Sequence, residues 1–177
     1  MSDREIIQLH KNGRGEEAFR ELVRAYSERL YWRLRHFLLS HEDADDLLQD
    51  IFIKVWQALP SFRGESGLYT WLYRIATNEA LNFIKKAKSK GAESLETLKD
   101  EGFEPAQSSA SPSGDEIQRR LAAAVRSLPP RQRIVFTMRY LDELPYEEIS
   151  GLLGTSVGAL KASYHFAVEK IKEKVLH

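Results

Sequence analysis

The sequence predicts an all-α protein with two small helical domains, residues 1–88 and 114–177, joined by a flexible linker. In both domains apolar side chains recur at steps of three and four residues, which is the spacing of one face of a helix. No segment shows a convincing alternation of apolar and polar residues, the pattern typical of a half-buried strand. Residues 89–113 instead have the composition of a linker.

The first domain begins with helical spacing that extends from Ile6 to Leu39. The apolar positions in this stretch include Phe19, Leu22, Val23, Tyr26, Leu30, Leu34, Phe37 and Leu38. The next helix has one apolar stripe, formed by Leu47, Leu48, Ile51, Phe52, Val55 and Trp56. Five polar residues lie off that stripe: Asp45, Asp46, Gln49, Asp50 and Lys54.

A loop and a third helix complete the first domain. Residues 60–67 contain a proline and two glycines, which break the helical pattern. The third helix is expected over residues 68–86, with a buried stripe of Leu72, Ile75, Ala76 and Phe83. Four polar residues share another face, because they are spaced at four, four and three positions: Arg74, Asn78, Asn82 and Lys85.

Residues 89–113 contain six serines, two glycines and two prolines, and five acids against two lysines give a balance of −3. This composition is typical of a flexible linker. A short helix over residues 95–100 is compatible with this composition.

The second domain is predicted to contain four helices. Asp115 can cap the first helix, and Pro129 and Pro130 end it. Its apolar stripe consists of Ile117, Leu121, Val125 and Leu128. The second covers residues 131–141. A short helix over 146–153, a tight turn over 154–156 and a longer helix over 157–175 follow, with Ser156 as the cap of the last.

A short helix, a glycine-containing turn and a longer capped helix are typical of a helix-turn-helix. The second helix would then present its exposed side chains to base edges in the major groove. Apolar residues would hold the two helices at a fixed angle: Ile149, Leu152, Leu153, Val157 and Leu160. An ordinary helical hairpin uses the same turn, so this segment alone supports DNA binding and a structural hairpin equally.

Two further patterns lie in the first domain. The first is a cluster of acidic and amide residues: Asp43, Asp45, Asp46, Gln49 and Asp50. Taken alone, this cluster is better explained as a solvated helix face, whose negative charges interact favourably with the N-terminal end of the helix dipole. The second pattern is a run of aromatic residues: Phe62, Tyr69, Trp71 and Tyr73. Basic and amide side chains are interleaved with them, a combination that suits the binding of single-stranded nucleic acid. The alternative is that these aromatic side chains belong to the hydrophobic core, and we expect burial of at least Trp71 or Tyr73.

Composition excludes several classes of protein. There are no cysteines, so neither disulfides nor thiolate metal sites can form, and the five histidines make no zinc-ligand cluster. We find no glycine-rich phosphate loop and no catalytic Ser/His/Asp order, so we expect no cofactor, no metal and no enzymatic activity. The chain has no apolar run of membrane-spanning length and no signal peptide, which indicates a cytoplasmic protein. Because the net charge is zero, a DNA partner requires basic residues grouped on particular faces.

Several runs of residues in the two predicted domains resemble regions 2 and 4 of the extracytoplasmic-function (ECF) sigma factors of bacterial RNA polymerase. The run Asp46-Leu47-Leu48-Gln49-Asp50-Ile51-Phe52 and the later Ser61-Phe62-Arg63-Gly64-Glu65-Ser66 with Tyr69-Thr70-Trp71-Leu72-Tyr73-Arg74 resemble region 2. The run Leu128-Pro129-Pro130-Arg131-Gln132-Arg133 and the stretch 144–161 resemble region 4. The resemblance covers nearly all of the chain outside the linker, and it implies two helical domains without the one that joins them in larger sigma factors.

The resemblance also implies a role for particular residues. The polymerase-binding helix would use Asp46, Gln49, Asp50, Phe52 and Trp56. The single-stranded −10 element, with one base flipped into the loop over residues 62–67, would be bound by Phe62, Arg63, Gly64, Ser66, Arg74, Asn78, Asn82 and Lys85. The duplex −35 element would be read by Ser156, Lys161, Ser163, Tyr164 and His165. The implied partners are core RNA polymerase, promoter DNA and an anti-sigma factor, and the linker would follow the RNA exit path.

The sequence departs from the family in its recognition helix, where the usual arginines are absent from residues 161–170. Because arginine to guanine is the commonest base contact, the −35 preference cannot be taken from relatives and part of it can rest on DNA shape. Tyr164 has an alternative role, packing inward with Leu160. A repressor or activator that binds duplex DNA without polymerase is the competing class, against which the zero net charge and the aromatic loop argue.

Overall fold

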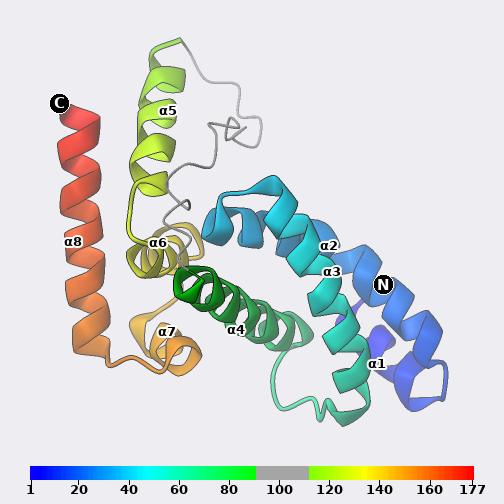
Figure 1. Cartoon of the computed structure of the whole chain (residues 1–177). Coiled ribbons are helices and arrows are strands. Elements are labelled where there is room, and N and C mark those ends of the chain that lie inside the picture. The colour runs from blue at the N-terminus through cyan, green and yellow to red at the C-terminus, as the bar shows by residue number, and fades with distance from the viewer. Residues whose placement is uncertain (91–111) are drawn as a thin grey trace. The chain divides into compact units, whose positions relative to one another are not determined.

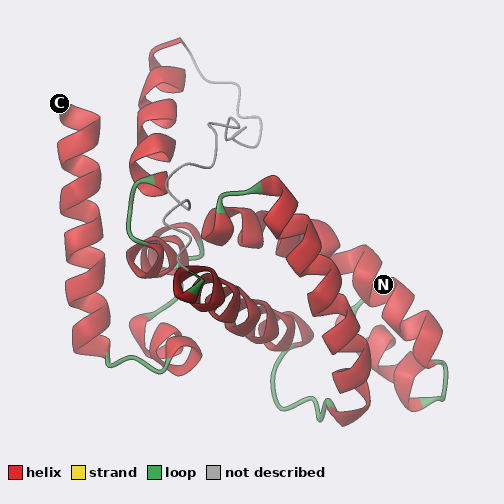
Figure 2. Ribbon diagram, in the orientation of Figure 1, coloured by secondary structure: helices red, strands yellow, loops and turns green. Residues whose placement is uncertain are grey.

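The computed structural model describes residues 1–90 and 112–177, and helices are the regular elements of those residues (Figures 1 and 2). The predicted all-α fold is therefore confirmed. The chain divides into two compact units, Met1–Lys90 and Gly91–His177. Most of the predicted linker, including the short helix expected over 95–100, lies outside the described residues.

The first unit contains α1 (Asp3–Lys11), α2 (Gly15–Leu38), α3 (His41–Ala58), the short 3-10 helix η1 (Leu59–Ser61) and α4 (Leu68–Ser89). The helical spacing expected from Ile6 to Leu39 is thus divided between two helices. Gly13 explains the break, because its φ of +78° is a left-handed conformation that ends α1 and that glycine adopts readily.

Local hydrogen bonds define the helix ends of this unit. Ser2 and Glu5 form a capping box at the start of α1. At the C-terminal end of α2, Leu39 has φ +69° and the Arg35 guanidinium donates a hydrogen bond to the Leu39 carbonyl oxygen. The Ser40 hydroxyl then accepts from the Asp43 amide at 3.2 Å and caps α3.

Helices α2, α3 and α4 pack against one another and form the core of the first unit. The buried side chains on α3 are Ala44, Leu47, Ile51 and Val55. The predicted stripe of α3 was too wide, because Leu48 and Phe52 are half-buried and Trp56 is exposed. On α4, Leu72 and Ala76 are buried as expected, whereas Ile75 and Phe83 are only half-buried.

The second unit contains α5 (Pro112–Arg126), α6 (Pro130–Phe136), the π-helical segment η3 (Thr137–Leu141), α7 (Tyr146–Leu153) and α8 (Val157–Leu176). Two expectations are corrected. The first helix begins at Pro112 and not after Asp115. The helix expected over 131–141 changes to π geometry, in which the Asp142 amide donates to the Thr137 carbonyl at 3.1 Å.

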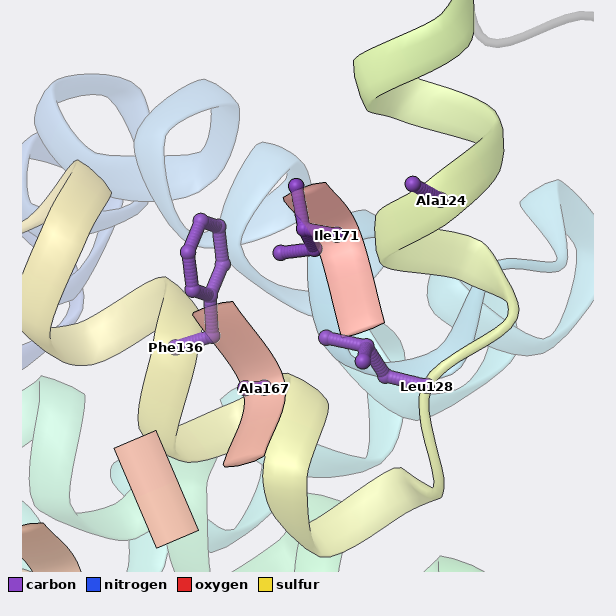
Figure 3. Close-up of a cluster of buried hydrophobic side chains, with 5 residues drawn as sticks. All are labelled: Ala124, Leu128, Phe136, Ala167 and Ile171. Atoms are coloured by element: carbon purple, nitrogen blue, oxygen red, sulfur yellow. The ribbon is translucent and has the colours of Figure 1, made fainter. Parts of the chain in front are cut away.

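Helix α8 packs against α5, α6 and α7. Figure 3 shows the cluster of buried side chains that joins α8 to α5 and α6: Ala124, Leu128, Phe136, Ala167 and Ile171. Phe136 also stacks with Tyr140 and Tyr164, at ring-centroid distances of 5.1 and 5.9 Å. These contacts set the orientation of α8 within its unit.

Replacing Phe136 by alanine should therefore destabilise the second unit by about 3–5 kcal/mol, because the change removes buried apolar area and leaves a cavity. Hydrogen exchange of the α8 amides in the full chain measures this free energy without relying on a single unfolding transition. The matched control is Ile117→Ala on α5, where the side chain is 59% exposed and the expected change is within about 0.5 kcal/mol. Equal protection of α8 in both variants would contradict the packing described above.

Candidate polymerase and nucleic-acid interfaces

One face of α3 combines acidic, amide and apolar side chains. We call it the α3 face: Asp46, Gln49, Asp50, Ile53 and Trp56. These residues lie three and four positions apart, so they project from the same side of the helix. All five are exposed, with Ile53 at 58% and Trp56 at 44%. The Trp56 and Phe52 rings both meet Phe19 edge-on, at centroid distances of 5.2 and 6.3 Å, which ties this side of α3 to α2.

Sequence reasoning missed Ile53. It lies four residues after Gln49, outside the buried stripe, and that position was the available signal. A large exposed apolar side chain surrounded by polar residues is typical of a protein–protein interface. In such an interface the surrounding contacts exclude water from the central residue when the partner binds. The α3 face can therefore bind a protein partner.

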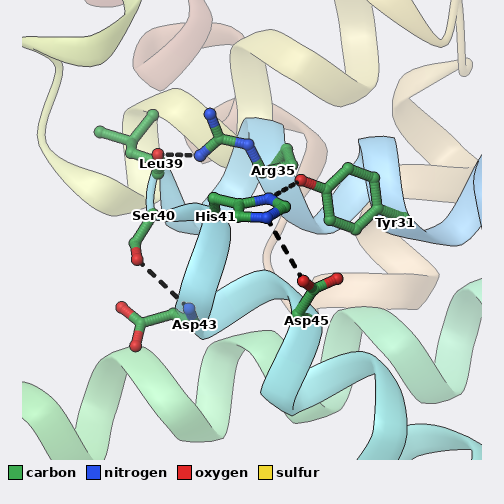
Figure 4. A network of polar contacts seen from close by, with 7 residues as sticks. All are labelled: Tyr31, Arg35, Leu39, Ser40, His41, Asp43 and Asp45. Carbon is green, nitrogen blue, oxygen red and sulfur yellow. Dashed lines mark hydrogen bonds and ion pairs between the residues drawn. The ribbon is translucent and has the colours of Figure 1, made fainter. Parts of the chain in front are cut away.

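The remaining acids of the cluster have local roles, which Figure 4 shows. The Asp43 amide is the donor to the Ser40 cap, and this carboxylate lies in the first turn, where the helix dipole favours it. Asp45 lies 3.4 Å from His41 Nε2, while the other ring nitrogen of His41 contacts the Tyr31 hydroxyl. Thus the helix dipole and the contact with His41 account for Asp43 and Asp45, and the α3 face contains the other two acids.

The loop over residues 62–67 is anchored at its start and exposed beyond it. Phe62 is half-buried against the Trp71 ring at a centroid distance of 4.9 Å. Residues 63–67 are exposed, including Arg63, Gly64 and Ser66. Gly64 has φ +74° with no atom within 4 Å of a built Cβ, so glycine is needed there for the backbone conformation and not for space.

The other two aromatics of this region pack against α2. Tyr69 stacks with Tyr26 at 5.7 Å, and the Arg29 guanidinium lies 3.5 Å from the centre of the Tyr69 ring. Tyr73 is buried. Phe62 and Trp71 are therefore the members of the aromatic run that remain beside the exposed loop.

Helix α4 continues from this loop with a polar face. We call it the α4 polar face: Arg74, Asn78, Asn82 and Lys85. All four are exposed, as their spacing predicts. On the α3 side, Glu79 forms an ion pair with Lys54 at 2.6 Å, which links α4 to α3. The face can offer two cations to phosphates and two amides to bases.

In the second unit, α7, a turn and α8 form a helix-turn-helix. Gly154 ends α7 with φ +62°, and the Ser156 hydroxyl accepts from the Ala159 amide at 3.2 Å. Ile149, Leu152 and Leu160 are buried between the helices, whereas Leu153 and Val157 are half-buried.

The residues expected to read the −35 element differ in exposure. Lys161 and His165 are exposed one turn apart, and Ser163 is half-buried. Tyr164 is half-buried between the rings of Phe136 and Tyr146, and burial raises its pKa. This placement favours the alternative in which Tyr164 packs inward. Sequence reasoning missed two exposed neighbours on the same helix, Ala162 and Phe166.

Comparison with known proteins defines the class. Residues 22–90 match the family "Sigma-70 region 2" and residues 118–171 match "Sigma-70, region 4". The first and second units thus contain the two regions of a sigma-70-type subunit.

The chain belongs to the ECF sigma factors of RNA polymerase, a family of non-enzymatic transcription initiation factors. It is 31% identical to the ECF RNA polymerase sigma-E factor of Escherichia coli (strain K12), over 99% of this chain and 95% of the relative. It is also 31% identical to the RNA polymerase sigma-H factor of Pseudomonas aeruginosa, over 96% and 91% of the two chains.

Two solved structures have a similar fold. The sigma factor RpoE in complex with the anti-sigma factor NepR from Bartonella quintana has a TM-score of 0.68 and 22% identity, over 89% of this chain and 96% of that one. CnrH in complex with the cytosolic domain of CnrY has a TM-score of 0.63 and 23% identity, over 97% and 95%. None of the helices described here has the length and apolar composition of a membrane span, and among the described residues no three His, Asp or Glu side chains are grouped as metal ligands.

Proposed function

We propose that this sigma factor uses three exposed surfaces for three contacts in transcription initiation. The α3 face binds core RNA polymerase. The loop over 62–67 and the α4 polar face bind the single-stranded −10 element. Helix α8 reads the −35 element as duplex. The observation that supports this assignment best is that the exposed polar and aromatic residues of each motif are grouped on one face.

Melting of the −10 element requires a base to leave the duplex stack, which costs a few kcal/mol. A pocket at the loop can offset this cost if it contacts the flipped base closely, and the left-handed conformation of Gly64 sets the course of the loop backbone there. Phe62 and Trp71 are beside the loop and offer ring surface for stacking. The cations of the α4 polar face then hold the adjacent phosphates, while Asn78 and Asn82 are within the same face to contact bases.

The remaining expectations belong to the same proposal. The factor acts in the cytoplasm with core polymerase, and it performs no catalysis itself. An anti-sigma factor holds it inactive by covering the α3 face, whose exposed Ile53 and Trp56 would otherwise stay in water. A protein of similar fold, the sigma factor RpoE from Bartonella quintana, forms a complex with the anti-sigma factor NepR, which supports a partner of this kind.

Replacing Lys161 by alanine should weaken promoter binding, because an exposed cation on α8 contacts either a guanine edge or a phosphate. A lost phosphate contact lowers the salt slope by about one with little change in sequence preference, whereas a lost base contact costs about 1–3 kcal/mol at one position. His165→Ala should change the preference at one −35 position.

Selection by the holoenzyme from a randomised −35 library measures both effects. Lys174→Ala is the matched control, since Lys174 is an exposed cation in the last turn of the same helix. We expect it to select as the unchanged protein does. Identical selection by all variants, with identical strength, would show that α8 does not read the −35 element.

A further inference from the structure

The exposed side of α8 has an apolar part that the assignments above leave unused. Phe166 is 57% exposed. Ala162 is also exposed and lies four residues earlier, so the two side chains are neighbours on one side of the helix. The core position next in sequence is filled by Ala167, which is fully buried. Phe166 therefore faces solvent, whereas the nearby Tyr164 ring is packed inward.

This apolar part lies beside the polar residues proposed to read DNA. The His165 and Phe166 rings are 6.0 Å apart at a tilt of 58°, and Lys161 lies one turn before His165. One turn further along, Glu169 is exposed and forms an ion pair with Lys172 at 3.3 Å. This ion pair balances the carboxylate charge of Glu169, so the groups beside Phe166 that can face DNA are the Lys161 ammonium and the His165 ring.

The chemistry of the major groove identifies what an aromatic side chain can contact there. Each base pair offers hydrogen-bonding groups, and thymine alone adds an apolar one, its 5-methyl group. The Phe166 side chain has no hydrogen-bond donor or acceptor, so it cannot form hydrogen bonds with the edges of guanine, cytosine or adenine. A methyl group is the one feature of the groove that it can dehydrate favourably.

We propose that Phe166, supported by Ala162, recognises the 5-methyl group of a thymine at one position of the −35 duplex. The inference rests on the proposed reading of the −35 element by α8 and deepens it. It assigns a base preference to this chain's recognition helix, where the arginines usual in the family are absent.

The test uses holoenzyme assembled from the full chain and core polymerase. Selection from a randomised −35 library should enrich thymine at one position, and Phe166→Ala should remove that preference alone. Replacing this thymine by uracil then deletes only the methyl group. The affinity of the unchanged holoenzyme should fall about three- to fivefold, while the affinity of the Phe166→Ala holoenzyme should not change.

Ile117→Ala serves as the control, because Ile117 is equally exposed in the same unit but lies on α5. It should keep the methyl dependence. The inference is overturned if the unchanged holoenzyme prefers thymine nowhere, if it binds thymine and uracil equally, or if Phe166→Ala retains the methyl dependence. Absence of any −35 selection by the unchanged holoenzyme would instead overturn the proposed role of α8.

Discussion

Deleting residues 63–66 should abolish open-complex formation while core polymerase binding persists. The deletion removes four of the five exposed residues that follow Phe62 and keeps Gly67, the N-cap of α4, so we expect the helices on either side to remain. Flipping one base costs a few kcal/mol, and without the loop this cost is no longer offset. A loss of about 3 kcal/mol corresponds to a reduction of open complexes by about a hundredfold.

Permanganate reactivity of unpaired thymines in the −10 element measures this loss directly. Binding of the same variant to core polymerase serves as its internal control, because the α3 face lies outside the deleted residues. Normal promoter melting by the deleted protein would mean that the loop is only a connector.

The second large effect is expected on the α3 face. Changing Asp50 to lysine should reduce affinity for core polymerase by about 2 kcal/mol or more, roughly thirtyfold, because a reversed charge in an interface repels the group that faced the original one. Asp50 is exposed and close in sequence to Ile53, so the fold should remain intact.

Glu28→Lys on α2 is the matched charge reversal, since Glu28 is exposed in the same unit but on another helix. Equilibrium binding of each labelled variant to core polymerase gives the comparison. If Asp50→Lys binds as tightly as Glu28→Lys, the polymerase contact is not on the α3 face.

Much of the architecture follows from local rules. The bounds of α7 and α8 were predicted to within about one residue, because Pro145, Gly154 and Ser156 mark the helix ends with specific backbone chemistry. The exposure of the α4 polar face was also predictable, since spacing alone places its four residues together.

Other features depend on packing that periodicity does not encode. The sequence pattern assigns every apolar residue of a stripe to the core, yet positions 48, 52 and 56 of α3 turn progressively away from it. Ile53 and Phe166 lie outside the predicted stripes, and their large exposed side chains were missed because the candidate contacts were chosen among polar residues and the residues of the family motifs. The π segment at Thr137–Leu141 leaves no distinct signal in the sequence.

The most direct test of the central claim is transcription by core polymerase, with and without the purified chain, from a library of promoter sequences. We predict that transcription starts only when both are present, from templates that share two elements at a constant spacing, and that the chain alone does not shift promoter duplex. Sequence-specific binding of duplex DNA by the chain alone, combined with no effect on the templates that core polymerase transcribes, would contradict the account and indicate an autonomous DNA-binding regulator.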